Sequence, residues 1–395
     1  MDRREFLKTA GFGAAGLAGA ALLAACQTEG GTVATTGGTT GGTGGAATTG
    51  NPDLDTALQA EDLPEVNWNL ATSWPTNLDT IFGGATTFAD RVSAMTNGRF
   101  TIDARAGGEL VPPLEVLQSV QQGAVDAGHT ASYYYLGLGQ WLAFGTALPF
   151  GLTARQQNAW LYYGGGLDML QQLYADKFNV IQFPAGNTGV QMGGWFNKEI
   201  KSLADIQGLR FRIPGLGGSV MDKLGAAVQV IAGGEIFQSL QTGAIDAAEW
   251  VGPYDDTKLE FQTVAKYYYY PGWWEPGPTL EVQIGLDKWN ALPEEYQEVV
   301  KSAAAHANVD MMASYDAKNP VAFNDLVNGS DVQVLPFPDD VMQAAEAAAF
   351  EIYDQNASDD PDFKSVFDAW KPFRDSANAW FKIAEGGMIN YQPQV

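Results

Sequence analysis

The stretch Leu117–Ala127 (LQSVQQGAVDA) returns 120 residues later as Phe237–Ala247 (FQSLQTGAIDA). Each copy runs from the end of a helical pattern, through a glycine, into a short strand-like run that ends in Asp-Ala. A Gly-Gly-Glu triplet precedes both copies, at Gly107–Glu109 and Gly233–Glu235. A helix–turn–strand unit used twice predicts two lobes built on one plan. A pocket between two such lobes is a common place to hold a small molecule.

The composition is that of a globular and acidic protein. The 395 residues are 46% hydrophobic and 12% aromatic, which is enough for two domains with a large core. Lys and Arg number 22 against 46 Asp and Glu, so the formal net charge is −24. This balance argues against nucleic acid as a partner and disfavours anionic lipid surfaces. A bound anion would need a specific cationic group at its site, against the field of the whole protein.

The N-terminus carries two export signals. Arg3–Lys8 (RREFLK) precedes the apolar stretch Ala10–Ala25 and resembles the bacterial twin-arginine (Tat) signal. Leu23–Cys26 (LAAC) resembles a lipobox, in which cleavage leaves a lipidated cysteine as the new first residue. Cys26 is the only cysteine, so no intramolecular disulfide forms. We expect a signal peptide at residues 1–25, export to the periplasm and a lipid anchor at Cys26.

Residues 26–62 are rich in Gly and Thr and contain almost no large apolar side chain. Such a segment buries too little surface to fold and is typical of a flexible tether. The folded part is therefore expected to begin near residue 63.

Helical and strand-like patterns alternate after Val66 and predict α/β units on mostly parallel sheets. The expected strands cover 66–71, 99–104, 124–129, 179–183, 209–213, 228–231 and 280–286. The expected helices cover 79–95, 110–122, 154–173, 217–224, 293–312, 320–327, 339–356 and 360–383. The sequence beyond the signal region contains no stretch typical of a membrane span.

Motifs for catalysis are scarce. The one thiol is assigned to the lipid anchor, and the two histidines, His129 and His306, stand alone in a strand end and a helix. A lone histidine of this kind is more often structural than catalytic. The sequence has no Gly-x-Ser-x-Gly, no His-Glu-x-x-His, no phosphate loop and no acidic calcium loop. A pair of carboxylates leaves little trace in a sequence, so a glycosidase remains an alternative.

Two arginines are candidates for binding an organic acid. Arg210 and Arg212 alternate in the apolar strand Leu209–Pro214 and therefore face the same side of it. A guanidinium matches a carboxylate in a bidentate fork, so we expect one of the two arginines to enter the cleft. A surface ion pair is the alternative role.

Carboxylates and an amide are candidates for binding a cation. The second repeat ends in Asp246–Pro253 (DAAEWVGP), which places Glu249 at the carboxyl end of a strand, where open α/β sheets bind ligands. Glu275 lies in another loop, after two tryptophans. Two carboxylates near an anionic ligand would repel it, so the arrangement predicts a cation between them. Hard cations take carboxylate, amide and carbonyl oxygens, and Gln191 is a candidate for the amide.

From about Val66 to its end, the chain resembles solute-binding proteins of tripartite ATP-independent periplasmic (TRAP) transporters, the DctP type. Arg210–Pro214 (RFRIP) is similar to the Arg-x-Pro element of that family. Ala247–Asp256 (AAEWVGPYDD) and Tyr269–Glu275 (YYPGWWE) resemble the branch that binds 2-oxoacids such as pyruvate together with a metal cation. The lipobox and the tether depart from the many relatives that diffuse freely.

The resemblance implies the two-lobed α/β fold of periplasmic binding proteins, with a long helix spanning both lobes and a helical C-terminus. We expect the first lobe at 63–188, with part of 280–335, and the second lobe at 189–279. The C-terminal helices are expected at 336–395. The ligand would bind at the interface, and the lobes would close over it.

The resemblance also implies the residues of the site. Arg212 corresponds to the arginine that clasps the carboxylate of the ligand. The implied cation ligands are Gln191, Glu249, the carbonyl of Trp250 and Glu275. Weaker candidates for the wall that faces the other lobe are Trp74, Tyr134 and Asn187. The cation is expected to be Na⁺, with Ca²⁺ as the alternative.

The implied function is transport rather than catalysis. The protein would bind a small 2-oxo or 2-hydroxy monocarboxylate and deliver it to the membrane permease subunits of a TRAP transporter. The helix at 360–383 would either join two copies as a homodimer or pack on its own body. The alternatives are binding of another organic acid such as lactate or a C4-dicarboxylate, an exported carbohydrate-active enzyme with Glu249 and Glu275 as acid and base, and a ligand-sensing lipoprotein without a permease.

Overall fold

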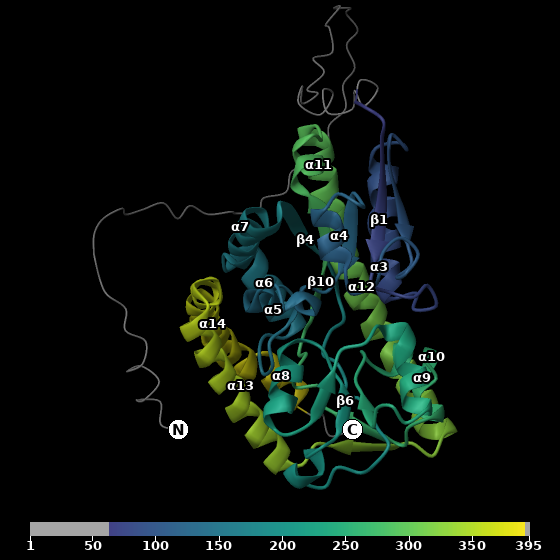
Figure 1. The fold of residues 1–395 in the computed structure, drawn as a ribbon, viewed down its shortest axis with the longest axis vertical. Helices are drawn as coiled ribbons and strands as arrows, with labels where there is room; N and C mark the ends of the chain where they lie inside the picture. Colours follow the sequence, from purple (N-terminus) through teal and green to yellow (C-terminus); the bar gives the residue numbers. More distant parts are fainter. Residues whose placement is uncertain (1–62, 392–395) are drawn as a thin grey trace, which may run out of the picture. The chain divides into compact units, whose positions relative to one another are not determined.

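The computed structural model describes residues 63–391. The signal peptide, Cys26 and the tether expected at 1–62 lie outside the described residues. Between residues 63 and 391, two mixed β-sheets carry helices on their faces (Figure 1). No helix in this range is both long enough and apolar enough to cross a membrane.

The first sheet has the strand order β2-β1-β3-β10-β4. Its strands are β1 (Val66–Thr72), β2 (Phe100–Arg105), β3 (Ala127–Thr130), β4 (Val180–Asn187) and β10 (Thr279–Gly285). β1 pairs in parallel with β2 and β3, whereas β10 runs antiparallel to both β3 and β4. We call this sheet and its helices the first lobe.

The second sheet has the strand order β11-β9-β5-β8-β6-β7. Its strands are β5 (Trp195–Phe196), β6 (Arg210–Arg212), β7 (Ala227–Gln229), β8 (Ala247–Ala248), β9 (Tyr267–Tyr270) and β11 (Gln333–Pro336). β6 pairs in parallel with β7 and β8, and β5 runs antiparallel to β8 and β9. Mostly parallel sheets were expected, but returning strands such as β10 and β5 make both sheets mixed. We call this sheet and its helices the second lobe.

The two copies of the repeat occupy equivalent places in the two sheets. The first forms α4 (Val116–Gln121) and β3 beside β1, and the second forms α9 (Ile236–Gln241) and β8 beside β6. In the first copy, the backbone N–H of Asn69 donates to Oδ2 of Asp126 at 2.9 Å. In the second, the N–H of Arg210 donates to Oδ2 of Asp246 at 3.0 Å. Each aspartate thus holds the neighbouring strand in the same way, so β1 and β6 occupy equivalent positions in their sheets.

The remaining helices connect and cover the sheets. Those longer than one turn are α3 (Ile81–Met95), α6 (Ala154–Tyr163), α7 (Gly166–Phe178), α8 (Gly215–Lys223), α10 (Pro253–Lys258), α11 (Leu286–Asn290), α12 (Glu294–Gly329), α13 (Asp339–Asp359), α14 (Pro361–Ile383) and α15 (Glu385–Ile389). Shorter helical turns are η2 (Ser132–Tyr135), η3 (Gln140–Leu142), α5 (Ala143–Thr146), η4 (Leu203–Ile206), η5 (Gly233–Glu235) and η6 (Phe261–Thr263).

Four expected helices differ in the structure. The helix expected at 154–173 is two helices, because Gly165 adopts a left-handed φ of +82° between α6 and α7. The helix expected at 110–122 begins only at Val116, after a Pro-Pro pair. The helices expected at 293–312 and 320–327 are one helix, α12, which continues through Pro320. A proline inside a helix costs about 3 kcal/mol, which the packing of α12 against both lobes offsets.

α12 confirms the expectation of a long helix that spans both lobes. Its 36 residues pack on α3 and β4 of the first lobe and on α10 of the second (Figure 1). One face of the helix is buried along most of its length, from Tyr296 to Leu326.

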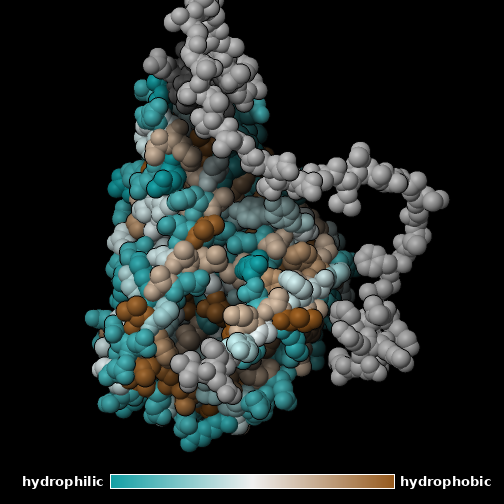
Figure 2. Space-filling model, turned by 180° about the vertical axis from the view of Figure 1, so that it is seen from behind, coloured by the Kyte–Doolittle hydropathy of each residue, from teal (hydrophilic) through white to brown (hydrophobic). Residues whose placement is uncertain are grey.

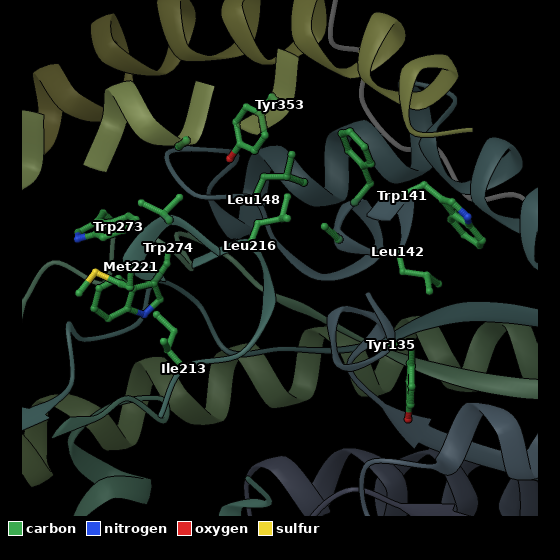
Figure 3. Packing of buried hydrophobic residues seen from close by; sticks show 14 of the residues in the cluster. Tyr135, Trp141, Leu142, Leu148, Ile213, Leu216, Met221, Trp273, Trp274 and Tyr353 are labelled. Carbon is green, nitrogen blue, oxygen red and sulfur yellow. The ribbon is translucent and has the colours of Figure 1, made fainter. Parts of the chain in front are cut away.

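One hydrophobic cluster passes from one lobe to the other. Figure 3 shows Tyr135 and Trp141 of the first lobe on one side, with Ile213 and Trp274 of the second lobe on the other. Tyr353 of α13 closes the cluster from above, and its hydroxyl donates to the carbonyl of Pro149 at 2.6 Å. α13 therefore packs on both lobes. On the face shown in Figure 2, hydrophobic residues gather in separate groups surrounded by hydrophilic ones.

Candidate functional site

A small cavity lies between the two lobes, where β1, β3, β6 and β8 end. The cavity volume is about 10 Å³, which is roughly the room that one water molecule needs. The residues that line it are Trp74, Ile81, Tyr133, Tyr134, Thr188, Gln191, Arg212, Trp250, Val251, Pro278 and Leu280. Five residues predicted from the sequence (Trp74, Tyr134, Gln191, Arg212 and Trp250) are therefore brought together here.

Arg212 supplies the positively charged side chain of the site. It ends β6, is 1% exposed and is held on three sides. Its Nε donates to the carbonyl of Ile231 at 3.1 Å, and its Nη1 donates to the carbonyl of Glu249 at 2.9 Å and to the Glu249 carboxylate. Burial lowers the pKa of Arg212, but the charge of Glu249 and the interactions with Tyr134 and Tyr133 together outweigh burial, and the net effect raises the pKa of Arg212. The guanidinium is therefore both charged and fixed in orientation.

Glu249 and Glu275 are two carboxyl groups buried beside Arg212, with exposures of 1% and 3%. Burial raises the pKa of Glu249 to about 8, although Arg212 acts in the opposite direction. Burial and the charge of Glu249 raise the pKa of Glu275 well above its usual range. Two carboxyl groups in this environment favour either a bound proton or a nearby cation over free negative charge.

Gln191 joins these groups through its backbone and its side chain. Its N–H donates to the carbonyl of Glu275 at 3.1 Å, and its own carbonyl accepts from the N–H of Gly272 at 2.9 Å. Its Nε2 donates to the hydroxyl of Thr188 at 3.2 Å, which leaves the amide oxygen as the free acceptor.

Four polar atoms of these residues share one property. Oε1 of Gln191, Nη2 of Arg212, Oε2 of Glu249 and Oε2 of Glu275 are buried and have no hydrogen-bond partner among residues 63–391. Buried polar atoms are nearly always paired, so a group of unpaired ones indicates a place for a ligand or an ion. One donor on a cation and three oxygen acceptors fit a carboxylate together with a hard metal ion.

The oxygen donors differ from those of common metal centres. Residues 63–391 contain no cluster of three or more His, Cys, Asp or Glu side chains that suits a metal ion. The set here is two carboxylates plus an amide, and backbone and ligand oxygens are available to complete it. This donor set matches Na⁺ or Ca²⁺, which take oxygen ligands of mixed type, rather than a thiolate- or imidazole-bound metal.

The aspartates that follow Glu249 and Trp250 position this segment. Oδ1 of Asp256 accepts from the N–H groups of Val251 and Gly252, at 3.2 and 3.1 Å. Oδ2 of Asp255 accepts from Trp250 Nε1 at 3.4 Å and from the hydroxyl of Tyr315 at 2.6 Å. Burial raises the pKa of Asp256 to about 7. Both aspartates thus act on the shape of the site, and this explains the length of the AAEWVGPYDD motif.

Two residues singled out in the sequence lie away from the cavity. Asn187 is buried, but its side chain bonds the carbonyl of Gly277, the hydroxyl of Thr279 and the N–H of Gly189, so it fixes the end of β4. Arg210 faces solvent and pairs with Asp246 at 2.6 Å. Of the two arginines in the strand, the structure therefore places Arg212 at the site.

Several lining residues gave no signal in the sequence. Tyr133, Thr188 and Leu280 line the cavity next to residues with clearer patterns, and Ile81, Val251 and Pro278 supply apolar walls. A hydroxyl or an aliphatic side chain becomes part of a site only through the fold. Tyr134 and Gln191, which the sequence did single out, lie close in the chain to Tyr133 and Thr188.

Comparison with known proteins identifies the family. Residues 70–360 match the family described as bacterial extracellular solute-binding protein, family 7, or DctP. The chain belongs to this family. It is 56% identical over 329 residues to a protein of a Nostoc species named a monocarboxylate 2-oxoacid-binding periplasmic protein, with 83% of this chain and 90% of that protein covered.

Solved DctP-type structures confirm the two-lobed fold. A TRAP transporter solute-binding protein from Bordetella bronchiseptica is 45% identical and has a TM-score of 0.82, with 83% of this chain and 97% of that chain covered. That protein is described with copurified calcium and picolinate. A TRAP solute-binding protein from Pseudoalteromonas atlantica, with bound sodium and pyruvate, is 35% identical at a TM-score of 0.80, covering 83% of this chain and 100% of that chain.

A cluster of charges joins the two lobes beside the cavity. Asp79, which precedes α3 of the first lobe, pairs with Lys258 of α10 and with Lys318 of α12, the latter at 2.9 Å. The hydroxyl of Tyr254 on α10 donates to both carboxylate oxygens of Asp79 at 3.0 Å. Partial burial opposes the charged form, but these bonds outweigh it and lower the pKa of Asp79 to about 2. A motion that separates Asp79 from α10 and α12 would break these contacts.

We expect Asp79→Asn to shift a solute-binding protein of this kind toward the open form. Exposed ion pairs contribute about 0.2–1 kcal/mol each, so ligand affinity should fall about two- to tenfold. Calorimetry at low and high salt measures this effect, and salt should weaken binding in the wild type more than in the variant. Asp103→Asn is the matched control, because Asp103 pairs with Arg105 inside the first lobe. Equal affinity for Asp79→Asn and the control would contradict a role in closure.

Proposed function

We propose that this DctP-family protein binds a small 2-oxo or 2-hydroxy monocarboxylate, such as pyruvate, together with Na⁺ or Ca²⁺, for uptake by a TRAP transporter. The observation that carries the proposal is the convergence of four unpartnered buried atoms, from Gln191, Arg212, Glu249 and Glu275. The names of the similar proteins, which refer to 2-oxoacids, pyruvate and picolinate, support the same class of ligand.

Arg212 holds the carboxylate of the ligand in this proposal. Its Nε and Nη1 are occupied by Ile231 and Glu249, so Nη2 is the atom that faces the ligand. The guanidinium is already immobilised in the protein, and binding therefore costs little side-chain entropy at this residue. In a buried site, a charge-assisted bond of this type is strong.

Gln191, Glu249 and Glu275 hold the cation, with the carbonyl of Trp250 as a further donor. When bound, the cation supplies the positive charge that balances the two carboxylates and a point to which a carboxylate oxygen and the 2-oxo or hydroxyl oxygen of the ligand attach. The donor set suits both Na⁺ and Ca²⁺, and the similar structures contain one or the other.

The walls of the cavity favour a monocarboxylate over a C4-dicarboxylate. Arg212 is the only Lys or Arg among the residues that line it, and Trp74, Ile81, Val251 and Leu280 are apolar. A second carboxylate placed against these side chains would lie unpaired in a buried place, at a large desolvation cost. The apolar part of the lining instead suits a short carbon chain.

The ligand is released unchanged to the permease in this proposal, without catalysis. Trp74, Tyr134 and Trp250 close over the ligand and exclude water. Similar proteins are named for the solutes they bind rather than for a reaction. Recovery of intact pyruvate after prolonged incubation with the protein tests this point, whereas formation of a product would favour the enzyme alternative.

Binding of pyruvate by variants of Arg212 tests the function directly. After removal of metal with a chelator, we expect wild-type protein to bind pyruvate tightly only when Ca²⁺ or Na⁺ is restored. Arg212→Lys retains a charge opposite Glu249 but loses the planar fork, and affinity should fall at least 100-fold. Lysine is preferred to alanine because an unpaired buried Glu249 would destabilise the fold by about 3–5 kcal/mol. Arg210→Lys, in the same strand but exposed, is the control.

Glu275→Gln separates the cation from the carboxylate site. It should weaken binding in the presence of Ca²⁺ and reduce the dependence of affinity on Ca²⁺ concentration. Wild-type affinity measured by calorimetry in both Arg212→Lys and Glu275→Gln would contradict the proposed site. Binding of pyruvate in the presence of the chelator, as tight as with metal, would exclude the cation.

We further propose that the protein is exported by the twin-arginine route and anchored in the membrane by lipid on Cys26. The twin arginines, the lipobox and membership of an extracellular solute-binding family support this. Wild-type protein should fractionate with membranes, and Cys26→Ser should appear in the soluble periplasmic fraction. Wild-type protein found wholly in the soluble fraction would contradict the anchor.

A second copy of the chain is the proposed partner of the C-terminal helices. The first half of α14 packs on its own body through Phe363, Val366, Phe367 and Trp370. Beyond this point, Trp380 and Ile383 of α14 are 63% and 65% exposed, and Met388 and Ile389 of α15 are exposed as well. Exposed apolar groups of this size favour an interface, and the Bordetella bronchiseptica structure is described as a dimer.

Light scattering of the purified protein measures the oligomeric state. We expect the wild type to have twice the mass of one chain and the double variant Trp380→Glu/Ile383→Glu to have the mass of one. Asp375→Ala, on the same helix, is the control and should remain dimeric. A monomeric wild type at all concentrations would exclude the homodimer.

A further inference from the structure

His129 lies outside the cavity but contacts one of its walls. It belongs to β3 and is 0% exposed. Nδ1 accepts a hydrogen bond from Nε1 of Trp74 at 2.7 Å, and Nε2 lies 3.1 Å from the carbonyl of Ala185 on β4. An indole N–H can only donate, and a carbonyl can only accept. The two partners therefore specify the neutral imidazole with its proton on Nε2.

The carbonyl of Ala185 on β4 can accept a bond from His129 because the sheet is irregular at this point. Leu280 of β10 pairs with Gly186, and the next residue, Glu281, pairs with Pro184, so Ala185 is the extra residue of a bulge. Bulges free a backbone group from the strand ladder and are frequent beside functional sites. Here the freed carbonyl of Ala185 receives the imidazole N–H and fixes the plane of the ring.

The backbone of α3 lies close to the imidazole. A Cβ atom added at Gly84 of α3 would lie 3.2 Å from Nε2 of His129, so the backbone of α3 packs directly against the ring. Burial lowers the pKa of His129 to about 4, and the ring stays neutral at physiological pH. A protonated ring would direct a second N–H at the indole N–H of Trp74.

Trp74 is the wall that this bond orients. Its ring lies 6.3 Å from the ring of Trp250 in the second lobe, in an edge-to-face arrangement at 73°. It is also within 6.1 Å of the ring of Tyr134. In the proposed function Arg212 and Gln191 bind the polar end of the ligand, so the carbon chain lies against the apolar lining, which includes the two tryptophans Trp74 and Trp250.

We propose that His129 is a positioning residue that fixes the Trp74 indole and thereby limits the length of the carbon chain the site accepts. The inference rests on the proposed function, because it concerns the same ligand site. His129 does not touch the ligand. It acts through one hydrogen bond, and its effect must therefore disappear when the indole N–H is removed.

A double-mutant cycle on His129 and Trp74 tests this. Affinities for pyruvate and for the longer 4-methyl-2-oxopentanoate are measured with Ca²⁺ for the wild type, His129→Leu, Trp74→Phe and the double variant. His129→Leu should weaken pyruvate binding about tenfold and narrow the preference for pyruvate over the longer acid. In the Trp74→Phe background, the same change should alter neither affinity by more than about twofold.

His129→Gln is the conservative rescue, because its amide oxygen accepts from Trp74 and its amide nitrogen donates to Ala185. It should retain most of the affinity and selectivity, and it serves as the test if His129→Leu fails to fold. An equal loss from His129→Leu in both backgrounds, or wild-type selectivity in His129→Leu, would overturn the inference.

The NMR signal of the indole N–H gives a readout that needs no ligand. The resonance missing in Trp74→Phe identifies Trp74, and it should shift in His129→Leu and remain close to its wild-type position in His129→Gln. An unmoved resonance in His129→Leu would contradict the bond. Wild-type protein that binds neither acid would defeat the proposed function, while this signal still tests the His129–Trp74 contact separately.

Discussion

The buried charge of Arg212 is the constraint on which the rest of the site depends. A guanidinium with 1% exposure must be compensated, and the carboxylate and carbonyl of Glu249 do so on one side. Nη2 of Arg212 is then left without a partner among the described residues. Glu275 adds a second buried carboxyl group, so carboxyl groups outnumber the one guanidinium. In the proposed function, a bound cation balances this surplus. Binding then neutralises charges that the fold has brought together at a cost in stability.

The fold delivers these groups through its internal repeat. Asp126 and Asp246 make the same bond to the neighbouring strand in each lobe, so β1 and β6 approach the interface in equivalent ways. One strand continues to an aromatic wall, Trp74, and the other ends at Arg212. The same architecture thus provides a hydrophobic side and a charged side of one cavity. α12, which packs on both lobes, keeps the two halves in register.

Much of the two-lobed fold and of the candidate site was predictable from the sequence. The repeat predicted the two lobes, and the segments around Glu249 and Glu275 indicated a site that the structure brings together with Arg212 and Gln191. The direct pairing of Arg212 with Glu249 was not predicted, because it depends on two strands meeting side by side. His129 was read as a structural histidine, and its bond to Trp74 requires a bulge in β4 that leaves no pattern. The continuation of α12 through Pro320 was missed because tertiary packing overrides a local preference.

A crystal structure of the protein with pyruvate and Ca²⁺ tests the central claim most directly. We predict one pyruvate in the interlobe cavity, its carboxylate on Nη2 of Arg212, and one Ca²⁺ bound by oxygens of Gln191, Glu249 and Glu275. Density for pyruvate elsewhere, or a Ca²⁺ ion away from these oxygens while Arg212 Nη2 still lacks a partner, would contradict it.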